Sequence, residues 1–301
     1  MDQRTVLNLA RKSLLGLTGH SFDVLRLEKP NSFESVAGMI KIISKLSPMV
    51  GNLIEINLAD YLNMNMAGSI AGRWTRQDPG FPDVVCDCAL NPMPGFEVKT
   101  WYPMATEITA RFKDSQNFFR DNQVDIVMLA WIPDNLYFGT PLTIRSMVAE
   151  GISVARARDD HYHNPPDYLV VEPENTASRA KNLQQTNTAG YKLQTGSDEE
   201  KHSEAANRAR EIGLAKGGYQ PTAEYQTAVK TLMSEFNYRL DTNYAKMDRI
   251  NHPEIEVFKT EVMKSEHLDK RMSHWKKLFE SLAKGGKGEE VNDLMKIWES
   301  G

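Results

Sequence analysis

The stretch "QVDIVMLAWIP", residues 123 to 133, constrains the fold more than any other part of this 301-residue chain. It is apolar at almost every position, too short to span a membrane and too continuous for a strand with one face in water. Such a run is typical of a strand that is buried on both faces at the centre of a sheet. We therefore expect neighbouring strands beside it and helices that cover the sheet.

Two further strands are predicted just before that run. Residues 83–90 and 96–102 are mostly apolar and flank "NPMPG", whose Asn, Pro and Gly favour a turn. We predict a β-hairpin there, and a further strand in "DYLVVEP", residues 167–173. Residues 63–80 are glycine-rich and are expected to be irregular. The sheet is predicted to be mixed and to contain four to six strands.

Apolar residues at helical spacing predict helices toward both ends of the chain. The expected helices lie at 5–17, 31–46, 47–65, 222–240, 252–284 and within 285–301. Ser47 is predicted to cap the third helix, with Pro48 at its first helical position. The fold class is accordingly α/β of the α+β kind: a mixed central sheet flanked by helices, with a largely helical C-terminal part.

Composition divides the chain into three predicted parts. Residues 1–173 contain the sheet and the N-terminal helices, and residues 221–301 form a helical region expected to pack on that core as one compact subunit. Residues 174–220 are polar and rich in Asn, Gln, Thr and Ser. This middle part is interpreted as a recognition segment, and a polar linker is the alternative.

The overall composition is that of a soluble globular protein, with 41% hydrophobic and 25% charged residues. The net charge of −4 means that a nucleic-acid partner would need a local basic surface. No apolar run reaches the length of a membrane span, and the N-terminus does not resemble a signal peptide, so we expect a cytoplasmic protein without a membrane partner. Cys86 and Cys88 are too few for a structural zinc site.

Charged residues stand among the apolar residues of the predicted hairpin. Asp83 begins the first strand, and Glu97 and Lys99 leave the same face of the second strand because they are two positions apart. An unpaired charge among buried strands costs several kcal/mol. Two carboxylates together with a backbone carbonyl, that of Val98, form an oxygen site that suits Mg²⁺, and Lys99 would lie beside the attacking water. A buried ion pair without catalytic function is the structural alternative.

The "PD" at 82–83 followed by "EVK" at 97–99 resembles the motif of the PD-(D/E)XK nuclease superfamily. The order "GNLIEINLADYL", "FEVKTWYP", "MLAWIP" is similar to that of the MutH-related restriction enzymes over roughly residues 45–135. This resemblance implies that the catalytic residues are Glu55, Asp83, Glu97 and Lys99, with Mg²⁺ held by Asp83, Glu97 and Val98. The spacing between the aspartate and the "EVK" is longer than in MutH, which leaves Asp87 as an alternative to Asp83.

Polar and basic side chains are candidates for DNA contacts in such an enzyme. Basic residues near the hairpin suit phosphate contacts, and the candidates are Arg73, Arg76, Arg111 and Lys113. In residues 175–195, amide side chains suit adenine and basic side chains suit guanine. The candidates for base contacts are Arg179, Lys181, Asn182, Gln184, Gln185 and Asn187.

These expectations combine into a type II restriction endonuclease that hydrolyses phosphodiester bonds of double-stranded DNA at a specific sequence with Mg²⁺. A palindromic site predicts a homodimer, since protein symmetry mirrors site symmetry. A cognate DNA methyltransferase is expected in the same restriction system, without a stable complex. Two alternatives stay open: a MutH-like repair endonuclease that nicks one strand as a monomer, and a DNA-binding protein of the same fold without catalysis.

Overall fold

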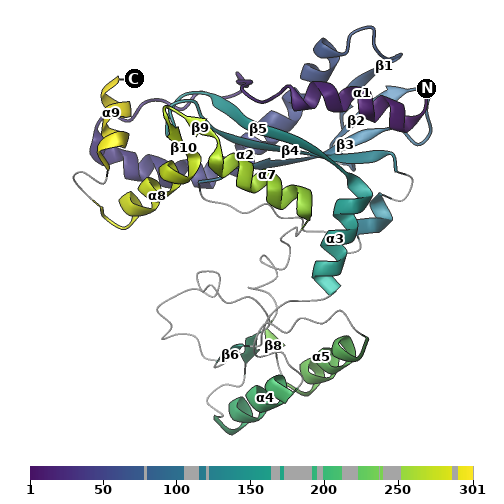
Figure 1. Cartoon of the computed structure of the whole chain (residues 1–301), viewed down its shortest axis with the longest axis vertical. Coiled ribbons are helices and arrows are strands. Elements are labelled where there is room, and N and C mark those ends of the chain that lie inside the picture. Colours follow the sequence, from purple (N-terminus) through teal and green to yellow (C-terminus); the bar gives the residue numbers. More distant parts are fainter. Residues whose placement is uncertain are drawn as a thin grey trace. The chain divides into compact units, whose positions relative to one another are not determined.

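The structure is a computed structural model of the chain. It describes residues 1–77, 80–104, 115–119, 122–163, 170–172, 192–194, 199–211, 223–236, 238–239, 252–286 and 291–300. The chain forms two compact units, and the larger contains residues 1–108, 116–155 and 252–301. The other unit contains residues 109–115 and 156–251. Figure 1 shows the elements of both.

The larger unit is built on a five-stranded mixed sheet with the order β1-β2-β3-β4-β5. The strands are β1 Gly72–Arg76, β2 Val84–Cys88, β3 Gly95–Trp101, β4 Val124–Pro133 and β5 Pro141–Glu150. β3 and β4 pair in parallel, and the other neighbours pair antiparallel. Every residue of β4 is buried, and β4 lies between β3 and the edge strand β5, which confirms a strand buried on both faces inside the sheet but not at its middle. The mixed sheet of four to six strands is confirmed as well.

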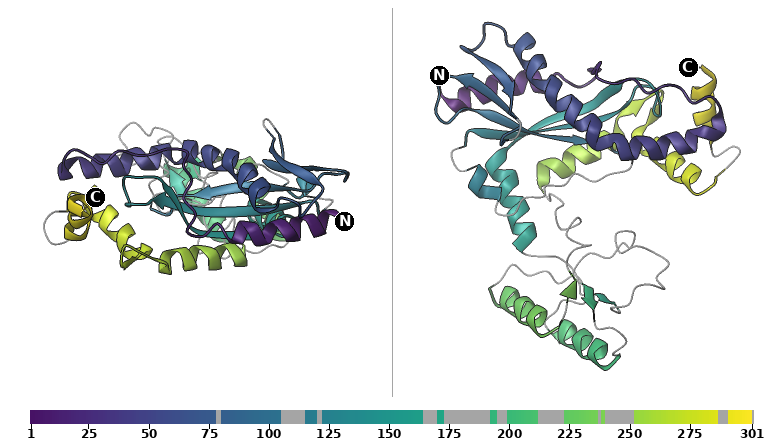
Figure 2. Two further views of the ribbon diagram at one scale, coloured as in Figure 1. Left: turned by 90° about the horizontal axis from the view of Figure 1, so that it is seen from above. Right: turned by 180° about the vertical axis from the view of Figure 1, so that it is seen from behind.

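Helices flank this sheet. Those of the larger unit are α1 Gln3–Leu15, α2 Val36–Asn65, α7 Pro253–Lys264, α8 Met272–Ala283 and α9 Asn292–Ser300, with the short 3-10 helix η1 Phe33–Ser35. A second 3-10 helix, η2 Ser115–Phe118, starts at the last residue of the segment 109–115. On β3, Thr100 meets Gly51 of α2, whereas the ring of Trp101 packs against Phe258 of α7 with centroids 6.2 Å apart. Consecutive residues of a strand point to opposite faces, so α2 and α7 cover opposite faces (Figure 2).

The second unit contains a three-stranded sheet and two helices. Its elements are β6 Val170–Glu172, β7 Lys192–Gln194, β8 Tyr238–Arg239, α4 Glu199–Glu211 and α5 Ala223–Glu235. The strand predicted in 167–173 therefore belongs to this small sheet and not to the central one. Helices α7, α8 and α9 belong to the unit of the central sheet, in line with the expected packing of the C-terminal helices on the core, whereas the other unit covers residues 156–251 rather than only the predicted segment 174–220. Helix α3, Gly151–His163, connects the two units.

The two helices predicted at 31–46 and 47–65 are one continuous helix, α2, with Pro48 in its interior. The prediction of Ser47 as a cap is therefore wrong. An interior proline costs a helix about 3 kcal/mol, because it removes one hydrogen bond and crowds the preceding turn. Buried residues on both sides of Pro48, among them Ile43 and Val50, continue one apolar face. Packing of this face in the hydrophobic core outweighs the local cost.

The single helix predicted at 252–284 is interrupted. After α7, strands β9 Glu266–His267 and β10 Lys270–Arg271 form a hairpin before α8 begins. Leu268 lies at the tip with φ 48° and is 41% exposed, so it lies outside both helices and contributes nothing to their buried faces. The indole Nε1 of Trp275 donates to the carbonyl of His267 at 2.8 Å and fixes α8 to the hairpin. None of the described helices combines the length and the apolar character that a bilayer crossing requires.

Gly51 allows α2 to lie close to β3, and this contact leads to a first prediction. A Cβ at position 51 would overlap the hydroxyl of Thr100. Overpacking of this kind costs about 1–3 kcal/mol, so we expect Gly51→Ala to lower the free energy of unfolding by that amount. Urea denaturation measures the change. Gly38→Ala is the matched control, because Gly38 lies on the same helix with nothing within 4 Å of the added methyl group.

The control should raise the stability, since glycine inside a helix costs about 0.5–1 kcal/mol relative to alanine. Thr100→Ala should restore the stability of the Gly51→Ala protein, because it removes the overlapping hydroxyl group. If Gly51→Ala and Gly38→Ala change stability equally, the close approach of α2 and β3 does not restrict residue 51 to glycine.

Candidate active site

Asp83 lies where strands β2 and β3 separate. The pairing of the two strands ends at Val84 opposite Phe96. Beyond that pair, the carboxylate Oδ2 of Asp83 accepts a hydrogen bond from the backbone N–H of Val98 at 2.6 Å. The carbonyl of Asp83 accepts from the N–H of Gln77 at 2.8 Å. The side chain thus occupies the position of a strand partner and brings its carboxylate next to Glu97.

Glu97 and Lys99 form an ion pair on the same face of β3. The Nζ of Lys99 donates to Oε1 of Glu97 at 2.5 Å and to the carbonyl of Val98 at 3.2 Å. Glu97 is 5% exposed, and its second oxygen, Oε2, is buried without a hydrogen-bond partner. Burial raises the pKa of Glu97, the charge of Lys99 opposes this rise, and the carboxylate of Asp83 adds to it. A cation near Oε2 would relieve both the burial and the repulsion.

Glu55, on helix α2, interacts electrostatically with Asp83 and Lys99 of this group. The Nε of Arg76, at the end of β1, donates to Oε1 of Glu55 at 2.8 Å, and both side chains are partly buried. Burial raises the pKa of Glu55, the negative charge of Asp83 raises it further, and Arg76 and Lys99 lower it. The four residues predicted as catalytic therefore influence one another, although they come from α2, from the start of the β2–β3 hairpin and from β3.

The donor set of this group fits a hard cation. Asp83 accepts from the N–H of Val98, and Lys99 contacts both Glu97 and the Val98 carbonyl, so two carboxylates and this carbonyl belong to one group of contacts. Mg²⁺ prefers such oxygen ligands and keeps several waters. The clearest sign of a cation site is Oε2 of Glu97, which is buried and has no hydrogen-bond partner. Among the residues that the structure describes, no three His, Cys, Asp or Glu side chains gather as a metal site. A cation here would be held by Asp83, Glu97, the Val98 carbonyl and water.

The other predicted residues divide into three groups. Asp87, the alternative ligand, is exposed and stands opposite Arg73 in the β1–β2 pairing, four residues along β2 from Asp83. Arg73 is exposed on β1, whereas Arg76 is bound to Glu55. The remaining candidates lie outside the described residues, and these are Arg111, Lys113, Arg179, Lys181, Asn182, Gln184, Gln185 and Asn187. The described geometry thus brings together the acidic residues and Lys99, with Asp83 rather than Asp87 beside Glu97.

Asn63 supports the site, although nothing in the sequence singled it out. Its side-chain amide accepts from the N–H of Trp74 and donates to the carbonyl of Trp74, both at 2.8 Å. These two bonds fix the edge strand β1 to α2, the helix that carries Glu55. The sequence could not indicate this contact, because Asn63 lies near the end of a predicted helix and its partner strand β1 was not predicted.

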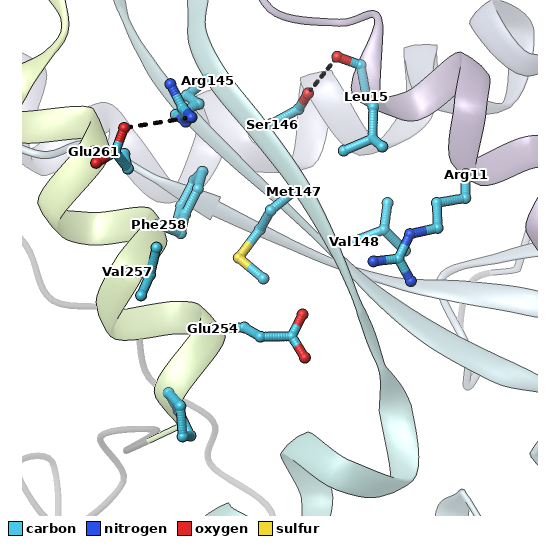
Figure 3. Close-up of a pocket in the computed structure, with 11 residues that line it drawn as sticks. Arg11, Leu15, Arg145, Ser146, Met147, Val148, Glu254, Val257, Phe258 and Glu261 are labelled. Atoms are coloured by element: carbon cyan, nitrogen blue, oxygen red, sulfur yellow. Dashed lines mark hydrogen bonds and ion pairs between the residues drawn. The ribbon is translucent and has the colours of Figure 1, made fainter.

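A groove of about 390 Å³ lies elsewhere in the larger unit, on β5 between α1 and α7 (Figure 3). It is lined by Arg11, Leu15, Arg145, Ser146, Met147, Val148, Pro253, Glu254, Val257, Phe258 and Glu261. Arg145 and Glu261 face each other across one end, 3.6 Å apart. The groove contains none of the four predicted catalytic residues.

The raised pKa of Glu97 leads to a prediction about stability and pH. A carboxyl whose folded pKa exceeds its unfolded value stabilises the fold below the unfolded pKa, and this contribution is lost as pH rises through the folded pKa. Without metal, the protein should therefore lose stability as the pH rises above the normal range of a glutamate. Glu97→Gln should remove this part of the loss and, at neutral pH, stabilise the metal-free fold by about 1 kcal/mol.

Chemical denaturation at several pH values, with and without Mg²⁺, measures both effects. Added Mg²⁺ should stabilise the wild-type protein at neutral pH and leave Glu97→Gln unchanged, since ligand binding to the native state adds stability. Equal stabilisation of both proteins by Mg²⁺ would place its binding elsewhere.

Comparisons with protein-family models, with curated proteins and with solved structures find no match for this chain. Its function is therefore inferred from its own residues.

Proposed function

We propose that this chain is a Mg²⁺-dependent endonuclease of the PD-(D/E)XK kind with a restriction-endonuclease-like fold, and specifically a type II restriction endonuclease. One observation carries the proposal: Asp83, Glu97 and Lys99 gather where β2 and β3 separate, and one buried carboxylate oxygen has no partner. Grouped charges in a largely apolar sheet are expensive without a function.

Each residue has a role that follows from its contacts. Asp83, Glu97 and the carbonyl of Val98 would hold Mg²⁺, which supplies charge neutralisation and a more acidic water when bound. The ammonium group of Lys99, held beside Glu97 and the Val98 carbonyl, would stabilise the negative charge that develops on the phosphate. Glu55, fixed by Arg76, would complete the acidic group from α2.

The rest of the proposal concerns partners. The substrate is double-stranded DNA, with phosphate contacts from Arg73, Arg111 and Lys113 and base contacts from residues 175–195. Arg76 would contribute to phosphate binding only by giving up its contact with Glu55. A homodimer would cut both strands of a palindromic site, and a separate methyltransferase would protect the host DNA in the cytoplasm.

Digestion of supercoiled plasmid DNA with Mg²⁺ tests the proposal, with sequencing of the fragment ends. We expect discrete fragments that end at one short repeated sequence, and no cleavage when the Mg²⁺ is chelated. Nicked circles that form only with added helper proteins would favour the MutH-like alternative. DNA binding without cleavage under any divalent cation would leave only a binding protein of this fold.

A further inference from the structure

Helix α2 carries a second apolar face that does not contribute to the core. The residues of this outer stripe are Ile42, Leu46, Met49, Leu53 and Ile56, spaced four, three, four and three positions apart. Ile42, Met49 and Ile56 are 50%, 46% and 43% exposed. This spacing keeps side chains on one side of a helix over about 21 Å. It is the spacing by which one helix packs against another.

The outer stripe is distinct from the face of α2 that packs on the sheet. That inner face carries Val50, Ile54, Leu58 and Leu62, all at most 1% exposed. Leu46 and Leu53 of the outer stripe are half-buried, and the other three residues are exposed. Isolated exposed apolar residues are normal, but a row of five apolar residues along one side of a helix marks an interaction surface. Figure 2 shows α2 running along one face of the sheet of the larger unit.

The order of residues in the outer stripe points to the identity of the partner. Read in either direction along the helix, the stripe is Ile, Leu, Met, Leu, Ile. A second copy of α2 that runs antiparallel, with the two helices crossing near Met49, would place similar side chains opposite each other. A two-fold symmetric contact needs this self-complementarity.

The charges beside the stripe favour the same arrangement. Lys41 and Lys45 are exposed near the N-terminal half of the stripe, and Asp60 is exposed one turn beyond its C-terminal end. An antiparallel copy brings the basic end of one helix to the acidic end of the other. A parallel copy would instead bring the lysines of both helices together, which repel each other.

We propose that the outer stripe of α2 is the homodimer interface of this protein, formed by two antiparallel copies of α2 that cross near Met49. The inference rests on the proposed function in one respect, since two-strand cutting requires a dimer. Two crossing helices form a small interface, so we expect a dissociation constant in the micromolar range.

Sedimentation velocity of the full chain at several concentrations tests the proposal. The wild-type protein should pass from monomer to dimer, and Met49→Glu should raise the dissociation constant at least about tenfold, because two like charges would meet at the two-fold axis. Met295→Glu is the matched control: Met295 is also an exposed helical methionine, 37% exposed on α9, and its substitution should leave the dimer unchanged. Circular dichroism verifies that both variants fold.

Cysteine cross-linking tests the direction of the two helices. In the antiparallel arrangement, Met49→Cys should form a disulfide between copies when an added oxidant such as diamide accepts the two electrons and two protons. Ile42→Cys should not, because the two copies of residue 42 lie at opposite ends of the contact. Cross-linking through both positions would overturn the antiparallel arrangement.

Two other outcomes would overturn the interface itself. One is a wild-type protein that stays monomeric at every concentration, with or without duplex DNA. That result is also expected if another part of the chain or a different protein covers the outer stripe. The other is a dimer that Met49→Glu does not weaken. The proposed nuclease is tested separately: a Met49-dependent dimer without cleavage would refute only the nuclease, and a monomer that cleaves plasmid DNA would refute only the interface.

Discussion

Replacing Lys99 with alanine is expected to lower the rate of Mg²⁺-dependent DNA cleavage by about 10²–10³-fold, the usual cost of removing one group that stabilises charge in the transition state. Lys99 is in direct contact with Glu97 and with the Val98 carbonyl, the atoms proposed to hold the metal. Cleavage of a plasmid under single-turnover conditions measures the rate. DNA binding, measured in Ca²⁺ by fluorescence anisotropy, should change far less.

The aspartate variants provide the matched comparison for this result. Asp83→Asn keeps a side-chain oxygen for the N–H of Val98 and removes the negative charge, so the fold should persist while Mg²⁺ binding and cleavage are lost. Asp87→Asn makes the same chemical change four residues further along the chain, at an exposed position of β2, and should cleave normally. Full cleavage by both Lys99→Ala and Asp83→Asn would refute the proposed active site.

The parts of the fold that the sequence predicted well are those with a strong local pattern. The continuous apolar run of β4, the turn between β2 and β3, and the apolar inner face of α2 each depend on residues close together in the chain. Strands β1 and β5 were not predicted. β1 is a short edge strand between a glycine-rich segment and the hairpin, and β5 contains Arg145, Ser146 and Glu150 and pairs with β4 through an irregular register.

In the candidate site, too, contacts between residues close in the chain were predicted, and contacts between distant residues were not. Asp83, Glu97 and Lys99 belong to one hairpin, so their spacing along the chain already predicted that they would meet. The contact between Glu55 and Arg76 joins α2 to β1, and no local pattern connects them. The pairing of Arg4 with Asp125 spans 121 positions. Asp125 is the one charged residue of the apolar strand β4, and its partner is visible only in the folded chain.

That pair gives the largest stability change we expect in this protein. The guanidinium of Arg4 on α1 donates to both carboxylate oxygens of Asp125, at 2.8 and 2.6 Å, and Asp125 is fully buried on β4. Arg4→Met would leave a buried carboxylate without its charge partner. Breaking a buried pair from one side costs about 3–5 kcal/mol, and because Arg4 is 31% exposed we expect a loss near the lower end, about 3 kcal/mol, in urea denaturation.

Two further variants separate this effect from the loss of an arginine as such. Arg145→Met removes an arginine of the same unit from Glu261, 3.6 Å away, where both side chains are about 40% exposed. Exposed pairs contribute about 0–1 kcal/mol, so this change should be small. Arg4→Met combined with Asp125→Leu should be more stable than Arg4→Met alone, because it removes the stranded charge. If the double variant is less stable than Arg4→Met, the loss comes from packing around α1 and β4 and not from the unpaired carboxylate.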